Sequence, residues 1–209
     1  MTATQLNAMA NERQGDRVYT PDWCAKDMVE WFGPSGTILE PCRGSGAIFR
    51  YLPEGSLWCE LDDGVDFFKW NTKVDWIISN PPYSKLRPWV RHSFKVADNI
   101  VYLIPIRNFT SGFGFIREAY DFGGVKQIRM YGTGNRLGFP MGNAVGAVHF
   151  CRNYSGDIRM SFYGEDNETH LMDEEERLAS IIFDHHSESG VRLSEQDCHI
   201  IAKEFLCDH

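Results

Sequence analysis

The chain is organised around Asp75-Trp76-Ile77-Ile78-Ser79-Asn80-Pro81-Pro82-Tyr83, an apolar run that stops at a double proline. Ile77 and Ile78 suit a buried central strand, whereas the two prolines have no N–H group with which to continue a strand ladder. The backbone is therefore expected to leave the sheet at Asn80. Ligands bind at the carboxyl ends of strands in open α/β sheets, so we expect the chemistry at this exit.

The exit brings together an amide side chain, a proline-fixed carbonyl and an aromatic ring. The oxygens of Asn80 and of the carbonyl that precedes Pro82 can accept both hydrogens of one amine. An aryl amine held in this way becomes pyramidal, and its lone pair is then ready for an electrophile. Tyr83 is placed to stack on the ring that carries the amine. Asn-Pro-Pro-Tyr is also compatible with an ordinary strand-ending turn, so the rest of the chain must decide.

Before this stretch, a short apolar strand runs into a glycine-rich turn, Glu40-Pro41-Cys42-Arg43-Gly44-Ser45-Gly46, and a helix start. Gly44 and Gly46 let the backbone approach a ligand closely. Phe49 stands where a dinucleotide fingerprint has its third glycine, which argues against dinucleotide binding. Glu40, at the tip of the strand, can hold a cationic amino group.

A second strand, 57–61, contains Glu60 near its end, about 20 residues after Glu40, which is where a carboxylate grips ribose hydroxyls in such folds. Asp66 and Phe67 follow, ahead of the organising strand. At the amino-terminal side, Thr20 is expected to cap a helix that has Pro21 at its first position. The alternation of helices and strands from 19 to 83 predicts a parallel, doubly wound α/β sheet.

Further elements are expected after the organising stretch. They are a helix over 86–97, a strand over 100–105, a glycine-spaced aromatic loop over 107–115, a helix over 115–121, a strand over 125–130 and a closing hairpin of 144–150 with 158–163. Three parts are expected: a flexible arm over 1–16, a catalytic domain over 17–163 and an acidic helical extension over 164–209.

Charge is distributed unevenly along the chain. Residues 1–163 hold 18 Lys/Arg and 16 Asp/Glu, whereas residues 164–209 hold 3 and 13. Nine basic residues against three acids over 85–136 form a zone that suits a phosphate backbone, although solvated helix faces would look the same. The candidates for backbone contact are Lys85, Arg87, Arg107 and Arg136. The acidic extension is expected to compete for the basic zone or to bind a protein partner.

The sequence has neither a signal peptide nor an apolar run of the roughly 20 residues that a membrane span needs, so a cytoplasmic protein is expected. The six cysteines are scattered, which predicts free thiols. Histidines and cysteines near the C-terminus lack the spacing of a zinc site, and no metal is expected.

The motifs Tyr19-Thr20-Pro21, Glu40-Pro41-x-x-Gly44-x-Gly46, Glu60, Asp66-Phe67 and Asn80-Pro81-Pro82-Tyr83 occur together in an order and spacing that resemble the gamma group of DNA adenine-N6 methyltransferases. The resemblance covers residues 17–163. It implies a Rossmann-like, mostly parallel seven-stranded sheet with an antiparallel last strand. It also implies S-adenosylmethionine as cofactor, S-adenosylhomocysteine as product and the N6 amine of adenine in DNA as methyl acceptor.

Roles for the motif residues follow from the same resemblance. Tyr19, Thr20 and Pro21 would contact the methionine end of the cofactor, and Glu40, Pro41, Gly44 and Gly46 would lie beside its amino acid moiety. Glu60 would take the ribose, Asp66 the adenine amino group and Phe67 the adenine face. Asn80, Pro81, Pro82 and Tyr83 would form the catalytic motif, with Phe139 as a second aromatic on a flipped base.

Sequence readout is the point at which the chain departs from that group, because no large recognition domain follows the catalytic part. Specificity would then be low, would come from the 107–115 and 131–143 loops, or would be supplied by a partner. Three alternatives remain: an RNA base methyltransferase, a glutamine methyltransferase of release factors, and an inactive methyltransferase-like binding subunit. The glutamine enzymes resemble the chain less, since they carry a helical domain ahead of the first glycine motif.

Overall fold

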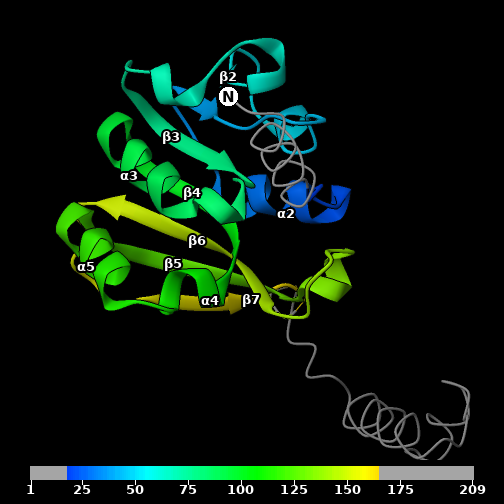
Figure 1. Ribbon diagram of the computed structural model, residues 1–209, viewed down its shortest axis with the longest axis vertical. Coiled ribbons are helices and arrows are strands. Elements are labelled where there is room, and N and C mark those ends of the chain that lie inside the picture. The colour runs from blue at the N-terminus through cyan, green and yellow to red at the C-terminus, as the bar shows by residue number, and fades with distance from the viewer. Residues whose placement is uncertain (1–17, 165–209) are drawn as a thin grey trace, which may run out of the picture. The chain divides into compact units, whose positions relative to one another are not determined.

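A computed structural model describes residues 18–164, which form one sheet with helices on both faces (Figure 1). The sheet is seven-stranded, and β6 is antiparallel to both of its neighbours while every other pairing is parallel. The strand order is β2 (Leu57–Trp58), β1 (Ile38–Glu40), β3 (Val74–Ser79), β4 (Ala97–Pro105), β6 (Ala144–Arg152), β5 (Gly123–Thr133) and β7 (Arg159–Phe162). The predicted mostly parallel α/β sheet is confirmed.

The four α-helices of the described part divide between the two faces of the sheet. They are α2 (Asp22–Phe32), α3 (Leu86–Val96), α4 (Ile106–Thr110) and α5 (Phe113–Phe122). Side chains of α3, α4 and α5 join one core cluster and those of α2 join the other. Ile77 of β3 points into the first cluster and Ile78 into the second, so both faces of this strand are buried. That double burial explains why Ile77 and Ile78 are apolar although they point to opposite faces of the sheet.

The expected hairpin of 144–150 with 158–163 is wrong. β7 instead runs parallel to β5, with Gln127 opposite Arg159 and Met130 opposite Phe162. The reason is that β6 is paired on both sides, with β4 and with β5, and has no edge left for another strand.

Two further local expectations are corrected. After Gly46 the chain forms only turns and one 3-10 helix, Phe49–Tyr51, because Pro53 and Gly55 stop helix growth in the short link to β2. The 107–115 segment is mostly helical, since α4 and α5 are separated by Ser111 and Gly112 alone. The other 3-10 helices are Leu61–Asp63, Phe67–Lys69, Tyr83–Lys85 and Gly134–Leu137.

A buried ion pair ties α2 to the sheet. Asp27 accepts hydrogen bonds from Arg129 Nε at 2.6 Å and Nη2 at 2.9 Å, and from the Tyr131 hydroxyl at 2.7 Å. The Arg129 side chain is 4% exposed, and its guanidinium also lies 3.8 Å from the ring centroid of Trp31. This contact positions the helix that follows the Tyr19-Thr20-Pro21 motif.

The expected arm at 1–16 and the acidic extension lie outside the described residues, apart from Gly164. Within 18–164, no helix combines the length and apolarity that crossing a bilayer requires.

Candidate functional site

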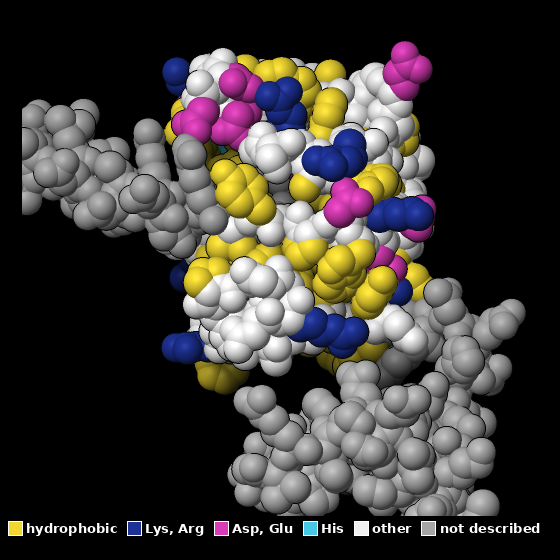
Figure 2. All heavy atoms as spheres, turned by 90° about the vertical axis from the view of Figure 1, so that its right-hand side faces the viewer, with side chains coloured by type: hydrophobic (Ala, Val, Ile, Leu, Met, Phe, Trp, Pro, Cys, Tyr) yellow, Lys and Arg dark blue, Asp and Glu magenta, His cyan; other side chains and the backbone are white. Residues whose placement is uncertain are grey.

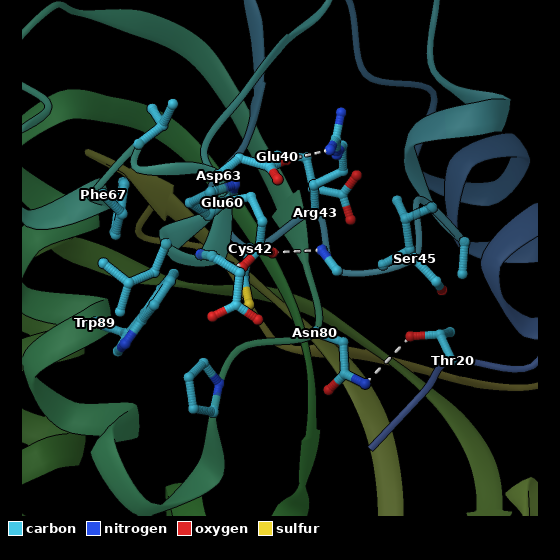
Figure 3. Close-up of a pocket in the computed structure, with 18 of the residues that line it drawn as sticks. Thr20, Glu40, Cys42, Arg43, Ser45, Glu60, Asp63, Phe67, Asn80 and Trp89 are labelled. Atoms are coloured by element: carbon cyan, nitrogen blue, oxygen red, sulfur yellow. Dashed lines mark hydrogen bonds and ion pairs between the residues drawn. The ribbon is translucent and has the colours of Figure 1, made fainter. Parts of the chain in front are cut away.

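A pocket of about 520 Å³ opens at the carboxyl ends of β1, β2 and β3 (Figure 3). This volume lies in the range of small-molecule sites. The wall is built by the turns that follow these three strands and by the segment before α2. Pocket-lining residues that the sequence predicted are Tyr19, Thr20, Glu40, Pro41, Gly44, Glu60, Asp66, Phe67, Asn80, Pro82 and Lys85.

Glu40 ends β1 with a carboxylate that is almost fully buried. The residue is 2% exposed, and its Oε2 atom has no hydrogen-bond partner within the described part of the chain. Burial raises the pKa of Glu40 to about 9, an effect that the Arg43 charge opposes and the Glu60 charge reinforces. A buried acid with an unused oxygen at the wall of a pocket is suited to receive a cationic group.

Glu60 joins the two turns that flank the pocket. Its Oε2 accepts a hydrogen bond from the Gly44 backbone N–H at 2.7 Å, and its Oε1 accepts one from Asp62 N–H at 3.2 Å. Gly44 has φ 53°, in the left-handed region that favours glycine. The Gly44 N–H is therefore bonded to Glu60, and the Glu60 carboxylate retains further lone pairs for hydroxyl groups.

Asn80 leaves β3 with its amide held in one orientation. The Nδ2 atom donates to the Val18 carbonyl at 3.0 Å and to Thr20 Oγ1 at 3.1 Å. A carbonyl oxygen can only accept, so the Val18 contact requires the nitrogen on that side of the amide. Figure 3 shows the nitrogen of Asn80 turned toward Thr20 and the amide oxygen turned the other way. Thr20 is consequently not the cap of α2, which has Pro21 at that position and no side-chain cap.

Aromatic rings close the pocket on the side of α3. Phe67 is 2% exposed because its ring stacks on Trp89 at a centroid distance of 4.9 Å and packs against His92. Phe68, which also lines the pocket, is 44% exposed. The sequence prediction selected Phe67 and missed Phe68 and Trp89. Two adjacent phenylalanines carry no signal that tells which of the two rings stays exposed.

Arg43 is a further pocket residue that sequence reasoning missed. Its guanidinium lies 3.8 Å from the ring centroid of Trp58, and Nη2 contacts Asp63 Oδ2 at 2.5 Å.

Asp66 Oδ1 accepts from Phe68 N–H at 3.0 Å. The pocket wall is thus predominantly acidic. Figure 2 shows a group of Asp and Glu side chains near the upper edge of this face, with Lys and Arg side chains both beside it and below it.

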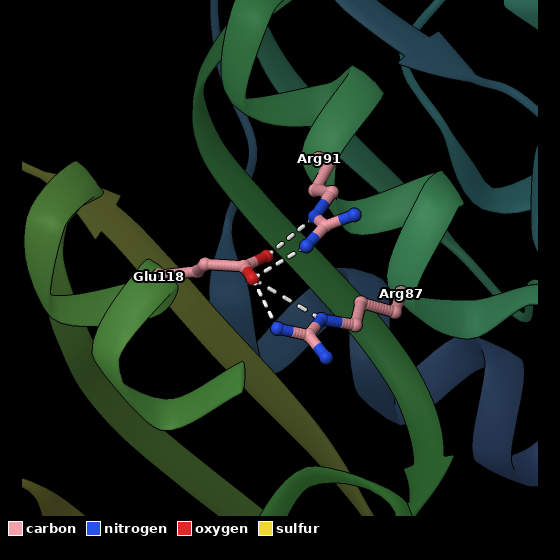
Figure 4. Close-up of polar contacts among 3 residues, drawn as sticks. All are labelled: Arg87, Arg91 and Glu118. Atoms are coloured by element: carbon pink, nitrogen blue, oxygen red, sulfur yellow. Dashed lines mark hydrogen bonds and ion pairs between the residues drawn. The ribbon is translucent and has the colours of Figure 1, made fainter. Parts of the chain in front are cut away.

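Several predicted residues lie outside the pocket lining: Pro21, Gly46, Pro81, Tyr83, Arg87, Arg107, Arg136 and Phe139. Tyr83 is half-buried and packs against the cluster on the α3 face. Phe139 is 3% exposed and belongs to the cluster on the α2 face, so this structure does not bring the two rings together. Arg87 is ion-paired with Glu118 (Figure 4).

Three cysteines of the described part are free thiols: Cys24, Cys59 and Cys151. Burial raises the pKa of the Cys59 thiol to about 11, so it carries no thiolate at neutral pH. Residues 18–164 contain no group of three or more side chains able to hold a metal ion. The histidines and cysteines weighed for zinc near the C-terminus lie outside the described residues.

The architecture matches solved structures of methyltransferases at low sequence identity. A structure from Listeria monocytogenes assigned to the class I S-adenosylmethionine-dependent methyltransferases has a TM-score of 0.54 and 11% identity, over 83% of this chain and 76% of that one. The chain has the class I methyltransferase fold. No protein-family model matches the sequence, and no curated protein matches it significantly.

Two further matches come from type I restriction-modification systems. The methyltransferase subunit from Streptococcus thermophilus has a TM-score of 0.55 and 13% identity, over 71% of this chain and 48% of that one. A modification subunit assigned to a type I restriction enzyme of Vibrio vulnificus has a TM-score of 0.53 and 16% identity, over 88% and 56%. The chain therefore spans about half the length of these subunits.

Proposed function

We propose that this chain is an S-adenosylmethionine-dependent methyltransferase that acts on the N6 amine of adenine in DNA. The observation that carries the proposal is the fixed amide of Asn80 at the exit of β3. The Nδ2 group of Asn80 donates hydrogen bonds to Val18 and Thr20, so the amide oxygen is the atom that can accept a hydrogen bond from an incoming amine. Together with the Pro81 carbonyl, that oxygen would hold both amine hydrogens and direct the nitrogen lone pair at the methyl donor.

The pocket suits S-adenosylmethionine, which supplies an electrophilic methyl group. Its charge on sulfur and its ammonium group favour an acidic wall. The unused Oε2 of Glu40 would receive the ammonium, and Glu60 would bind the ribose hydroxyls. Asp66 would accept from the adenine amino group, with Phe67 and Phe68 along the ring. Tyr19, Pro41, Gly44 and Thr20 complete the wall.

Methyl transfer would then proceed by direct in-line displacement, in which the nitrogen–carbon bond forms as the sulfur–carbon bond breaks. The proton leaves the nitrogen for solvent or a neighbouring acceptor. No cysteine takes part, because the reaction needs no covalent enzyme intermediate. Tyr83 would stack on the target base; Phe139 can do so only if the 134–141 segment moves away from the core, since its ring is now buried.

DNA is preferred over RNA as substrate because the type I modification subunits share the fold. Sequence specificity would be low or supplied by a protein partner. Lys85, Arg87, Arg107 and Arg136 would contact the phosphate backbone of the nucleic acid. An RNA base amine is the second candidate, since a single-stranded base needs no flipping and the amine site would be the same. A glutamine side chain and a non-catalytic binding role are the remaining alternatives.

The test combines product identification with one variant pair. Nucleoside mass spectrometry of DNA and RNA, after expression in a methylation-free host, identifies the methylated base, and incorporation assays include protein substrates. Asn80→Ala should slow single-turnover transfer by about 100-fold or more, because the lost acceptor acts most strongly as charge develops on nitrogen, while cofactor affinity stays unchanged.

Asn71→Ala is the matched control, since Asn71 is exposed and does not line the pocket. Equal transfer rates for the Asn80 variant and the parent would refute the mechanism. Methylation found only in RNA would show that RNA, and not DNA, is the substrate. Absence of transfer to any substrate would favour a non-catalytic binding subunit.

A further inference from the structure

An exposed aromatic ring stands at the junction of α4 and α5. Phe113, the first residue of α5, is 91% exposed, and Gly112 and Gly114 on either side of it leave the ring unscreened. Single exposed apolar residues are common on protein surfaces, so exposure alone assigns nothing. What distinguishes Phe113 is the charged group beside it.

Arg87 of α3 lies directly against the backbone next to this ring. A Cβ atom placed on Gly114 would lie 2.9 Å from Arg87 Nη2 and 3.8 Å from Nη1. The guanidinium therefore rests in the space that the missing side chain of Gly114 leaves open. The cation of Arg87 thus lies against the residue that directly follows the exposed Phe113 in the chain.

Glu118 holds that cation in place without neutralising the region. Its carboxylate accepts from Arg87 Nε at 3.1 Å and from Arg87 Nη2, and from Arg91 Nε at 2.6 Å and Nη2 at 2.7 Å (Figure 4). The two arginines lower the pKa of Glu118 to about 2, so it stays ionised. Two positive charges share one negative charge, which leaves one positive charge for an external anion.

Phe113 and Arg87 lie toward the edge of the sheet at which the pocket opens. Arg87 follows Lys85, which lines the pocket, by two residues. α4 begins where β4 ends, and β4 is the neighbour of β3, whose exit carries Asn80. A strand of nucleic acid that presents its base to the pocket would therefore pass this edge.

We propose that Phe113 and Arg87 form a binding site for one unpaired nucleotide that flanks the target base, with the base stacked on Phe113 and its phosphate on Arg87. The inference rests on the proposed nucleic-acid substrate. Stacking on a phenyl ring accepts any base, and a phosphate carries no sequence information. The site would therefore favour single-stranded or locally opened substrate and would contribute no sequence readout of its own.

The test measures binding separately from methyl transfer, with the full chain and a fluorescent 12-nucleotide single strand, alongside the same sequence as a duplex. Phe113→Ala should weaken single-strand binding roughly tenfold and duplex binding less, and Phe113→Trp should restore it, because base stacking on aromatic rings is sequence-tolerant. Tyr120→Ala is the matched control, since Tyr120 is 53% exposed on the same helix.

Arg87→Gln should lower the slope of log affinity against log salt by about 0.7, the value for one phosphate contact on a single strand, whereas Phe113→Ala should leave the slope unchanged. Equal binding by Phe113→Ala and the parent, an equal loss in Tyr120→Ala, or no binding of either oligonucleotide would overturn this proposal. Phe113-dependent binding without methylation would retain the site and refute the proposed enzyme activity instead.

Discussion

Thr20 Oγ1 accepts a hydrogen bond from Asn80 Nδ2 at 3.1 Å, although the two residues are sixty positions apart in the chain. The Val18 carbonyl accepts the second hydrogen of the same nitrogen. The segment that precedes α2 thereby determines which end of the Asn80 amide faces the pocket. A residue expected to cap a helix instead orients the side chain at the centre of the proposed chemistry.

Thr20→Val should remove one of the two acceptors that orient Asn80 and leave the backbone unchanged. We expect single-turnover methyl transfer to fall about 10-fold, roughly the value of one hydrogen bond, with a smaller change in cofactor affinity. Thr20→Ser keeps the hydroxyl and should transfer at nearly the parent rate. Indistinguishable rates for the valine and serine variants would show that the Val18 carbonyl alone orients the amide.

Glu60→Gln should weaken S-adenosylmethionine binding by about 1–3 kcal/mol, because hydrogen bonds from hydroxyls to a charged acceptor are stronger than those to an amide. Glutamine retains one oxygen for the Gly44 N–H at 2.7 Å and gives up only the longer bond from the Asp62 N–H at 3.2 Å, so the turn should survive. Calorimetric titration of the variant measures the loss. Glu54→Gln is the control, since Glu54 is exposed ahead of β2 and does not line the pocket; an equal loss there would remove Glu60 from the site.

The stability of the protein should depend on pH through Glu40. Its pKa is raised from 4.5 to about 9 by burial, so between these values the unfolded chain has lost a proton that the folded chain keeps. The unfolded state then binds fewer protons, and the free energy of unfolding falls as pH rises from about 4.5 to about 9. Glu40→Gln, which cannot ionise, should remove this contribution.

Urea unfolding of the parent and of Glu40→Gln at pH 5 and pH 8.5 isolates the effect, because other titrating groups cancel in the difference. The variant should gain stability relative to the parent at the higher pH. A difference between the two proteins that does not change with pH would mean that Glu40 is ionised throughout this range.

Asp27→Asn should destabilise the fold strongly. It removes the carboxylate that faces the 4% exposed Arg129, and breaking a buried ion pair costs about 3–5 kcal/mol. Glu30→Gln on the same helix breaks the Lys26–Glu30 pair, whose side chains are 56% and 66% exposed, and should change stability by less than about 1 kcal/mol. Chemical denaturation of both variants measures the contrast, and similar losses would contradict the structural role of Arg129.

The order of the main elements could be predicted from the sequence because the signals are local. The apolar run into Pro81 and Pro82 marks a buried strand and its end, since proline removes the ladder donor wherever it occurs. The expected strand over 100–105 and the expected helix over 86–97 correspond to β4 and α3, since their apolar patterns are local signals as well. Glu40, Glu60 and Asn80 were placed at one edge because the carboxyl ends of parallel strands meet there.

Only the tertiary structure decided how those side chains are partnered. The partner of Thr20 is sixty residues away. The phenylalanines at 67 and 68 both pack against Trp89 of α3, yet one ring is 2% exposed and the other 44%. β7 lies beside β5 since β6 is already paired on both edges. Each outcome depends on which distant residues are in contact in the folded chain. Local propensity carries no information on these contacts, because hydrogen bonds and packing contacts form between segments that the fold alone brings together.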